Sequence, residues 1–244
     1  MRYILNAVKT FMLCAIIFPV LLSQCYAQSV TGPSEKPRIG IIGAGWMGGT
    51  VGRAWVRAGY HVMFSTRHPQ ELESMVKPLG KLASIGTPRE AAAYGDVIFL
   101  ATPYGAIPQI SHDYAKELSG KVILDATNAS GGHGSIFDEA EKDGDAVTNA
   151  RYFHYAKLVR AFSSVWANAI EASSVRANDK LAVPIASNDP AALPVAETLV
   201  KAAGCVPVSI GDLSKAYLFE LGGPAVSINT TEAHMRTLLG LAPQ

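Results

Sequence analysis

A glycine-rich turn between a predicted strand and a predicted helix constrains the fold of this chain more than any other feature. Residues 38–42 (RIGII) form a short apolar run, which is typical of a strand buried in a parallel sheet. The run leads into GAGWMG at residues 43–48, and residues 47–58 then place apolar side chains three or four positions apart, as an amphipathic helix does. A strand, a GxGxxG turn and a helix in this order predict a dinucleotide-binding unit.

Each glycine of this turn has a separate expected role. Gly43 permits the tight turn, Gly45 lets a pyrophosphate approach the backbone, and Gly48 allows the helix to pack closely on the strand. The helix N-terminus presents free N–H groups and a partial positive charge to the phosphates. The alternative is a glycine-rich turn that binds nothing.

The end of the second predicted strand, residues 61–64, indicates which dinucleotide is preferred. NAD enzymes place an acidic residue there to bind the ribose hydroxyls. This chain has Ser65, Thr66 and Arg67 instead, with two hydroxyls and a guanidinium that suit a 2′-phosphate. The pattern favours NADP, and the alternative is an exposed polar loop of accidental composition.

The remaining pattern predicts a Rossmann-type α/β fold, a doubly wound parallel sheet with a small C-terminal extension. Further strands are expected at residues 82–85, 96–101 and 121–126, and helices at 69–76, 89–94 and 106–118. Thr102 and Pro103 follow one strand and Asn128 follows the next, so they are expected at the carboxyl edge beside the nicotinamide. Ordinary turn chemistry is an equal alternative for these three residues.

Beyond Asn128 the alternation of strands and helices loosens. Strands are expected at residues 158–162, 181–186 and 206–210, and a helix at 229–239. A helix that begins at Asp189 would be disrupted by Pro194. We therefore assign residues 37–160 to an NADP-binding domain and residues 161–244 to the extension.

The first 27 residues have the pattern of a secretory signal peptide. Arg2 and Lys9 precede an apolar core at residues 10–22, and Cys25 and Ala27 provide small residues for cleavage after Ala27. Residues 28–36 are a polar linker, and an uncleaved membrane anchor is the alternative. An exported protein, periplasmic or secreted, with no membrane span after cleavage is expected.

Charge and composition exclude several other functions. The net charge of +1 gives no basic patch for nucleic acid. The six histidines show no metal-ligand spacing, no catalytic pair is evident, and Cys205 would be the single cysteine left after cleavage. No metal, catalytic residue or internal disulfide is therefore predicted, and a homodimer remains an open alternative to a monomer.

Five segments together resemble a known family. They are RIGIIGAGWMG (38–48), FSTRHP (64–69), FLATPYGAIP (99–108), ILDATNA (123–129) and VRAFSSVW (159–166). These segments resemble the NADP oxidoreductase family that includes the deazaflavin (coenzyme F-420)-dependent NADP reductases. The cytosolic domain of six-span metalloreductases shares several of them.

The resemblance implies contacts for individual residues. It implies phosphate contacts at Gly45, Trp46, Met47 and Gly48, 2′-phosphate contacts at Thr66 and Arg67, and nicotinamide contacts at Thr102, Pro103 and Asn128. Family members commonly have Lys-Ala-Phe-Asn-Thr where this chain has RAFSS at 160–164.

The resemblance also implies a reaction: hydride transfer between NADPH and a small-molecule acceptor such as a flavin or deazaflavin. The acceptor is expected between residues 103–106, Asn128 and residues 221–224. A non-catalytic exported nucleotide-binding protein is the rival from another class. A reductase of imines or 2-hydroxy acids would need a longer helical C-terminal domain than this chain has.

Overall fold

The computed structural model describes residues 36–243, whose helices surround a single eight-stranded sheet. The predicted signal peptide and residues 28–35 of the predicted linker lie outside the described residues. The strand order is β3-β2-β1-β4-β5-β6-β7-β8, and every pair is parallel except β6 with β7. The strands are β1 (Ile39–Ile42), β2 (Val62–Ser65), β3 (Ala83–Gly86), β4 (Val97–Leu100), β5 (Val122–Asp125), β6 (Lys157–Ala161), β7 (Ala182–Ser187) and β8 (Val206–Ser209). The predicted Rossmann-type fold is confirmed.

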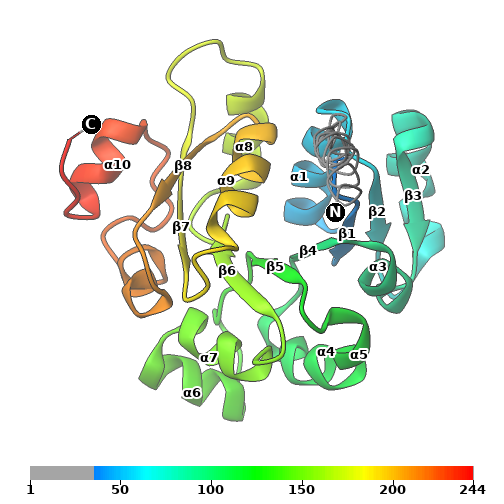
Figure 1. Cartoon of the computed structure of the whole chain (residues 1–244), viewed down its shortest axis with the longest axis horizontal. Coiled ribbons are helices and arrows are strands. Elements are labelled where there is room, and N and C mark those ends of the chain that lie inside the picture. Colours follow the sequence, from blue (N-terminus) through cyan, green and yellow to red (C-terminus); the bar gives the residue numbers. More distant parts are fainter. Residues whose placement is uncertain (1–35, 244) are drawn as a thin grey trace, which may run out of the picture. The chain divides into compact units, whose positions relative to one another are not determined.

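Helices cover both faces of this sheet (Figure 1). One face packs against α1 (Trp46–Arg57), α2 (Glu73–Val76), α8 (Ala167–Ser174) and α9 (Leu193–Ala202). The other packs against α3 (Pro88–Tyr94), α4 (Ile107–Asp113), α5 (Ala115–Leu118), α6 (Ser135–Asp143), α7 (Asp145–Tyr152) and α10 (Glu232–Leu238). Short 3-10 turns are η1 (Pro69–Leu72), η2 (Lys77–Leu82), η3 (Tyr104–Ala106) and η4 (Leu213–Phe219).

The central strands are apolar on both sides because both faces are covered. In β1, Ile39 and Ile41 belong to the core under α1, and Ile42 belongs to the opposite core. Trp55 links α1 to α9, since its indole N–H donates to the Leu199 carbonyl at 2.8 Å. Its ring also meets Phe99 and Phe162 edge-on, with centroids 5.1 and 6.2 Å away.

Four details differ from the sequence expectations. The helix expected at 106–118 is broken at Tyr114 into α4 and α5, and α6 and α8 were not expected. Pro194 causes no disruption because α9 begins at Leu193, which places the proline in the first turn. The domain boundary proposed at residue 160 falls inside β6.

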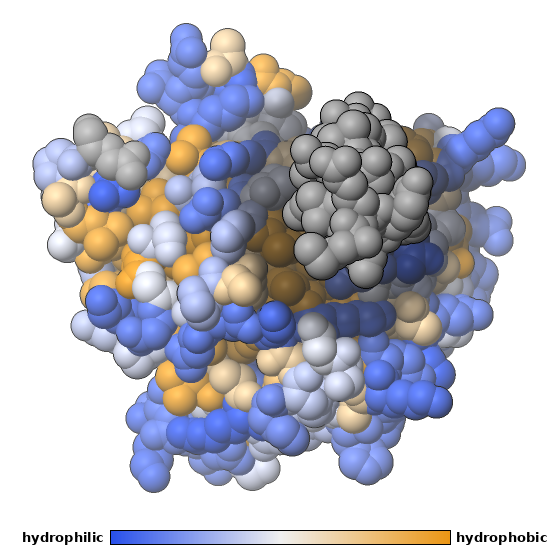
Figure 2. All heavy atoms as spheres, viewed as in Figure 1, coloured by the Kyte–Doolittle hydropathy of each residue, from blue (hydrophilic) through white to orange (hydrophobic). Residues whose placement is uncertain are grey.

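The surface is uneven in polarity. Figure 2 shows hydrophilic residues along the lower rim, over α6 and α7, and more hydrophobic residues on the left, toward α10 and η4. Within residues 36–243 no helix is long and apolar enough to cross a membrane.

Candidate functional site

The glycine turn lies at the carboxyl edge of the sheet, where the strand order changes direction between β1 and β4. Gly43 has a φ of +98°, a conformation that glycine adopts without strain. The N–H groups of Gly43 and Ala44 donate to the Ser65 carbonyl at 3.3 and 2.8 Å, so the end of β2 holds the turn in place. Ligands of doubly wound sheets bind at this point.

Gly45 and Gly48 illustrate two different uses of glycine. A Cβ added at Gly48 would lie 2.1 Å from the Gly43 carbonyl oxygen, so only glycine lets α1 pack this closely on the turn. A Cβ added at Gly45 would meet no atom of residues 36–243 within 4 Å. Gly45 caps α1 without a side-chain hydrogen bond, and this open space at the helix N-terminus fits a phosphate group.

Trp46 and Met47 begin α1, and their first-turn N–H groups lie at the same helix end. The Trp46 side chain is 63% exposed. Its ring lies beside that of Trp166, with centroids 6.5 Å apart and planes tilted by 37°.

The three residues at the end of β2 have different environments. The Ser65 hydroxyl is buried and donates to the Ile41 carbonyl at 2.5 Å, which makes it a structural contact in this arrangement. Thr66 is half-buried and Arg67 is exposed. No hydrogen bond or ion pair within residues 36–243 engages the Arg67 guanidinium, which is therefore available for an anion.

Thr102, Pro103 and Asn128 lie at the ends of β4 and β5, as predicted. The Thr102 Oγ1 atom is buried and has no hydrogen-bond partner in the described part of the chain. The Asn128 side chain is fixed at both ends, since Nδ2 donates to the Ser163 carbonyl at 2.8 Å and Oδ1 accepts from Arg160 at 2.9 Å. One amide N–H of Asn128 and the Thr102 hydroxyl remain to meet a ligand, which fits a nicotinamide carboxamide.

Behind Asn128 lies a buried ionic cluster that is absent from the expectations drawn from the sequence. Arg160 of β6 is fully buried and donates to Asp125 at 2.8 Å and to Asp145 at 3.2 Å. Its Nε lies 3.5 Å from a Glu220 oxygen without forming a hydrogen bond. Glu220 accepts from the N–H groups of Asp145 and Ala146, at the start of α7.

One guanidinium therefore faces three carboxylates in a buried space. Burial raises the pKa of Asp145 and of Glu220, and the charge of Arg160 opposes both shifts. Burial also disfavours the charged form of Arg160, but Asp125, Glu220 and Asp145 together raise its pKa. Burial and the neighbouring acids raise the pKa of Tyr104 well above its usual range. The cluster therefore holds Arg160 charged and fixes the orientation of Asn128.

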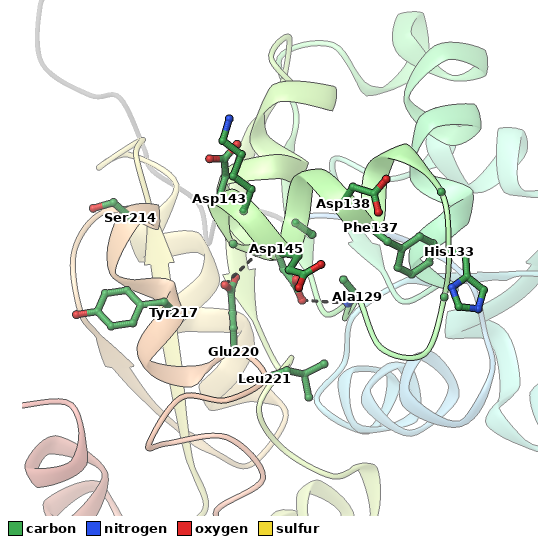
Figure 3. A pocket seen from close by; sticks show the side chains of 16 residues that line it. Ala129, His133, Phe137, Asp138, Asp143, Asp145, Ser214, Tyr217, Glu220 and Leu221 are labelled. Carbon is green, nitrogen blue, oxygen red and sulfur yellow. Dashed lines mark hydrogen bonds between the residues drawn. The ribbon is translucent and has the colours of Figure 1, made fainter.

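A cleft of about 720 Å³ opens beside this cluster, between α6, α7 and η4 (Figure 3). Asp145 and Glu220 lie at its centre, Phe137 and His133 on the α6 side, and Tyr217 on the η4 side. Five carboxylates line the cleft with one lysine: Asp138, Glu141, Asp143, Asp145, Glu220 and Lys142. Within residues 36–243 no group of three or more His, Cys, Asp or Glu could hold a metal ion.

A sequence signal for the cluster was present. Asp125 ends an otherwise apolar strand, and Arg160 interrupts another. A charged residue inside a buried strand requires a partner, because an unpaired buried charge is costly. The partners Asp145, at the start of α7, and Glu220, just after η4, lie outside the strands and gave no such signal.

The parallel sheet, the glycine turn with space at Gly45 and the residues at the carboxyl edge define a dinucleotide-binding protein of the Rossmann class. Residues 38–129 match the family model of coenzyme F420-dependent NADP oxidoreductases. The predicted resemblance to that family is confirmed over this part of the chain.

Three known proteins are similar to this chain. The rat metalloreductase STEAP3 is 26% identical over 191 residues, which are 75% of this chain and 36% of the rat protein, so the chain spans about a third of that relative. The hypothetical protein SMa0349 from Sinorhizobium meliloti has a TM-score of 0.68 at 22% identity, covering 81% of this chain and 96% of that one. A protein from Arthrobacter sp. FB24, described as a candidate F420-dependent NADP-reductase, has a TM-score of 0.65 at 20% identity, with 81% and 100% covered.

These matches show a likeness to NADP oxidoreductases over residues 38–129 and to part of a metalloreductase, the two resemblances that the sequence predicts. The two structural matches are below 25% identity and establish the fold alone.

Proposed function

We propose that this protein transfers a hydride between NADPH and a flavin-like or deazaflavin-like acceptor. The observation that supports this most is the open space at Gly45, at the start of α1, together with the Arg67 guanidinium at the end of the neighbouring strand, which no side chain of residues 36–243 engages. The first suits the pyrophosphate, and the second suits the 2′-phosphate that distinguishes NADP from NAD.

The residues of the chain would bind and orient the cofactor. Gly45, Trp46, Met47 and Gly48 present backbone to the pyrophosphate, while Thr66 and Arg67 hold the 2′-phosphate. Thr102, Pro103 and the fixed Asn128 amide frame the nicotinamide. The bound cofactor supplies the hydride, and the protein contributes alignment of two rings.

Turnover separates this proposal from its rival, a non-catalytic nucleotide carrier or sensor. NADPH oxidation is measured under anaerobic conditions with riboflavin, FMN and a deazaflavin as acceptors. We expect acceptor-dependent oxidation with at least one of them, and a higher kcat/KM with NADPH than with NADH. Tight NADPH binding without turnover on any acceptor would support the carrier instead.

We further propose that the protein is exported and that its mature chain begins at Gln28. The charged start, apolar core and Ala27 site support this proposal. N-terminal sequencing of the protein from its native host is expected to begin at Gln28. A chain that retains Met1 and fractionates with membranes would indicate an uncleaved anchor.

A further inference from the structure

We propose that Trp46 and Trp166 together form the platform on which the flat ring of the acceptor stacks. This inference rests on the proposed function and names the surface that recognises the acceptor, in place of the position expected from the sequence between residues 103–106, Asn128 and residues 221–224. The two indoles are 63% and 51% exposed, which is unusual for the largest apolar side chain.

The topology explains why the two rings meet at this edge of the sheet. β6 runs parallel to β5, so the segment after β6 also emerges at the carboxyl edge. Trp166 caps α8 there, and Trp46 is the first residue of α1. The two helices pack side by side, and both begin at this edge (Figure 1).

The charges around the two candidate sites favour binding of a flavin nucleotide at the tryptophan pair, compared with binding in the acidic cleft. Five carboxylates line that cleft, and they would repel the phosphate of FMN. The indole pair instead lies beside the N-terminus of α8, whose partial positive charge attracts an anion, while the N-terminus of α1 is left to the pyrophosphate of NADP. No side chain of the described residues caps the start of α8.

The segment that leads to Trp166 has two further features of a binding site. Phe162 has a φ of +64°, a strained conformation for an aromatic residue. The hydroxyls of Ser163 and Ser164 are buried without a hydrogen-bond partner in the described residues. A strained turn with unpaired hydroxyls is retained more readily where a ligand uses it.

The test measures FMN binding by equilibrium dialysis, with NADP⁺ present so that no reaction occurs. Stacking on one aromatic side chain predicts that Trp166→Ala and Trp46→Ala each raise the Kd for FMN about tenfold. Trp166→Phe retains a flat ring and is expected within about threefold of the parent. The NADP⁺ Kd of Trp166→Ala is expected to stay within about twofold.

Tyr217→Ala is the matched control. Tyr217 is 62% exposed, similar to Trp46, but lines the acidic cleft. We expect this variant to bind FMN like the parent. If Tyr217→Ala lost more FMN affinity than the tryptophan variants, the FMN ring would lie in the cleft and the platform would be wrong.

Fluorescence gives a second readout because the chain has three tryptophans and Trp55 is fully buried. The emission of Trp46 and Trp166 is the part that is missing from the Trp46→Phe/Trp166→Phe variant. In the parent, bound FMN is expected to quench most of this part. Quenching confined to Trp55 emission would contradict stacking.

The remaining outcomes separate this inference from the proposed function. If the parent binds and reduces FMN while both tryptophan variants keep its Kd, the platform is wrong and the function stands. If the parent binds NADP⁺ but neither FMN nor a deazaflavin, the proposed acceptor itself is wrong. If Trp166→Ala splits a dimer in sedimentation, a second copy covers the pair and the platform is refuted.

Discussion

The glycine turn and the Arg160 cluster lie at the same edge of the sheet but are built in opposite ways. The turn consists of backbone N–H groups, a carbonyl from β2 and the space left by missing side chains. The cluster consists of charged side chains from β5, α7, β6 and the segment after η4. A substitution in the turn can therefore abolish binding and leave the fold intact. A substitution in the cluster affects the stability of the fold and the orientation of Asn128 together.

The largest expected effect of a single substitution is in the cluster. Arg160→Met would leave Asp125, Asp145 and Glu220 buried without a cation and is expected to destabilise the protein by about 3–5 kcal/mol. Urea unfolding measures this loss. Arg38→Ala is the control, because the Arg38–Asp96 pair is about half exposed and should cost at most about 1 kcal/mol. Similar losses for the two variants would mean that the cluster is no more important than a surface pair.

The second largest effect distinguishes the two roles of glycine in the turn, open space for a phosphate at Gly45 and close packing at Gly48. Gly45→Val is expected to weaken NADPH binding at least about a hundredfold, or about 2.7 kcal/mol, with an unchanged thermal melt. Gly48→Ala places a Cβ against backbone and is expected to lower stability by about 1–3 kcal/mol. NADPH fluorescence titration and melting are recorded for both. Parent-like NADPH affinity in Gly45→Val would show that phosphate does not occupy this space.

Selectivity for NADPH is the third effect. Arg67→Ala is expected to weaken the binding free energy of NADPH by roughly 1.5–3 kcal/mol, which is about 10–150-fold in affinity, because a charge-assisted contact to the 2′-phosphate disappears. NADH affinity should not change. His68→Ala, an exposed neighbour, is the control and should leave the preference intact. Equal affinity of the parent for NADPH and NADH would contradict the assignment.

The smallest expected effect is a pH dependence of the free energy of unfolding that arises from Glu220 of the cluster. Because burial raises the pKa of Glu220, the unfolded chain loses this proton at a lower pH than the folded protein does. Protonated Glu220 therefore contributes its full stabilisation below the ordinary glutamate pKa. This contribution is lost as the pH rises through the pKa of Glu220 in the folded protein, and the free energy of unfolding falls by up to about 1.4 kcal/mol per pH unit.

Glu220→Gln removes this titration and should flatten that part of the profile, measured by urea unfolding between about pH 4 and pH 8. Exposed carboxylates with a lowered pKa, such as Glu90, act in the opposite direction and are the same in both proteins. A parallel profile for parent and variant would show that Glu220 does not titrate in this range.

The sequence predicted the turn because its chemistry is local. Glycine spacing, the flanking apolar runs and the missing acid after β2 all lie within 30 residues, and the strand–turn–helix order followed from them. The alternation of β1 to β5 was equally local. Ser65 shows the limit, because its position in the motif could not reveal that its hydroxyl is turned inward onto Ile41.

The cluster and the indole pair could not be predicted in the same way. Asp125 and Glu220 are 95 positions apart, and Trp46 and Trp166 are 120 apart. Their meeting depends on β6 joining the sheet beside β5 and on β7 reversing direction. Periodicity finds the elements but not the order in which strands pair.

The position of Arg160 in β6 has a consequence for how this fold can be divided. Strand β6 pairs with β5 on one side and β7 on the other, and its arginine faces acids from both halves of the chain. A fragment that ends before β6 would expose one edge of the sheet and leave Asp125 and Asp145 without their cation. The nucleotide-binding half is therefore not a module that can be recombined with a new C-terminal half unless the incoming segment supplies both a strand and a buried positive charge.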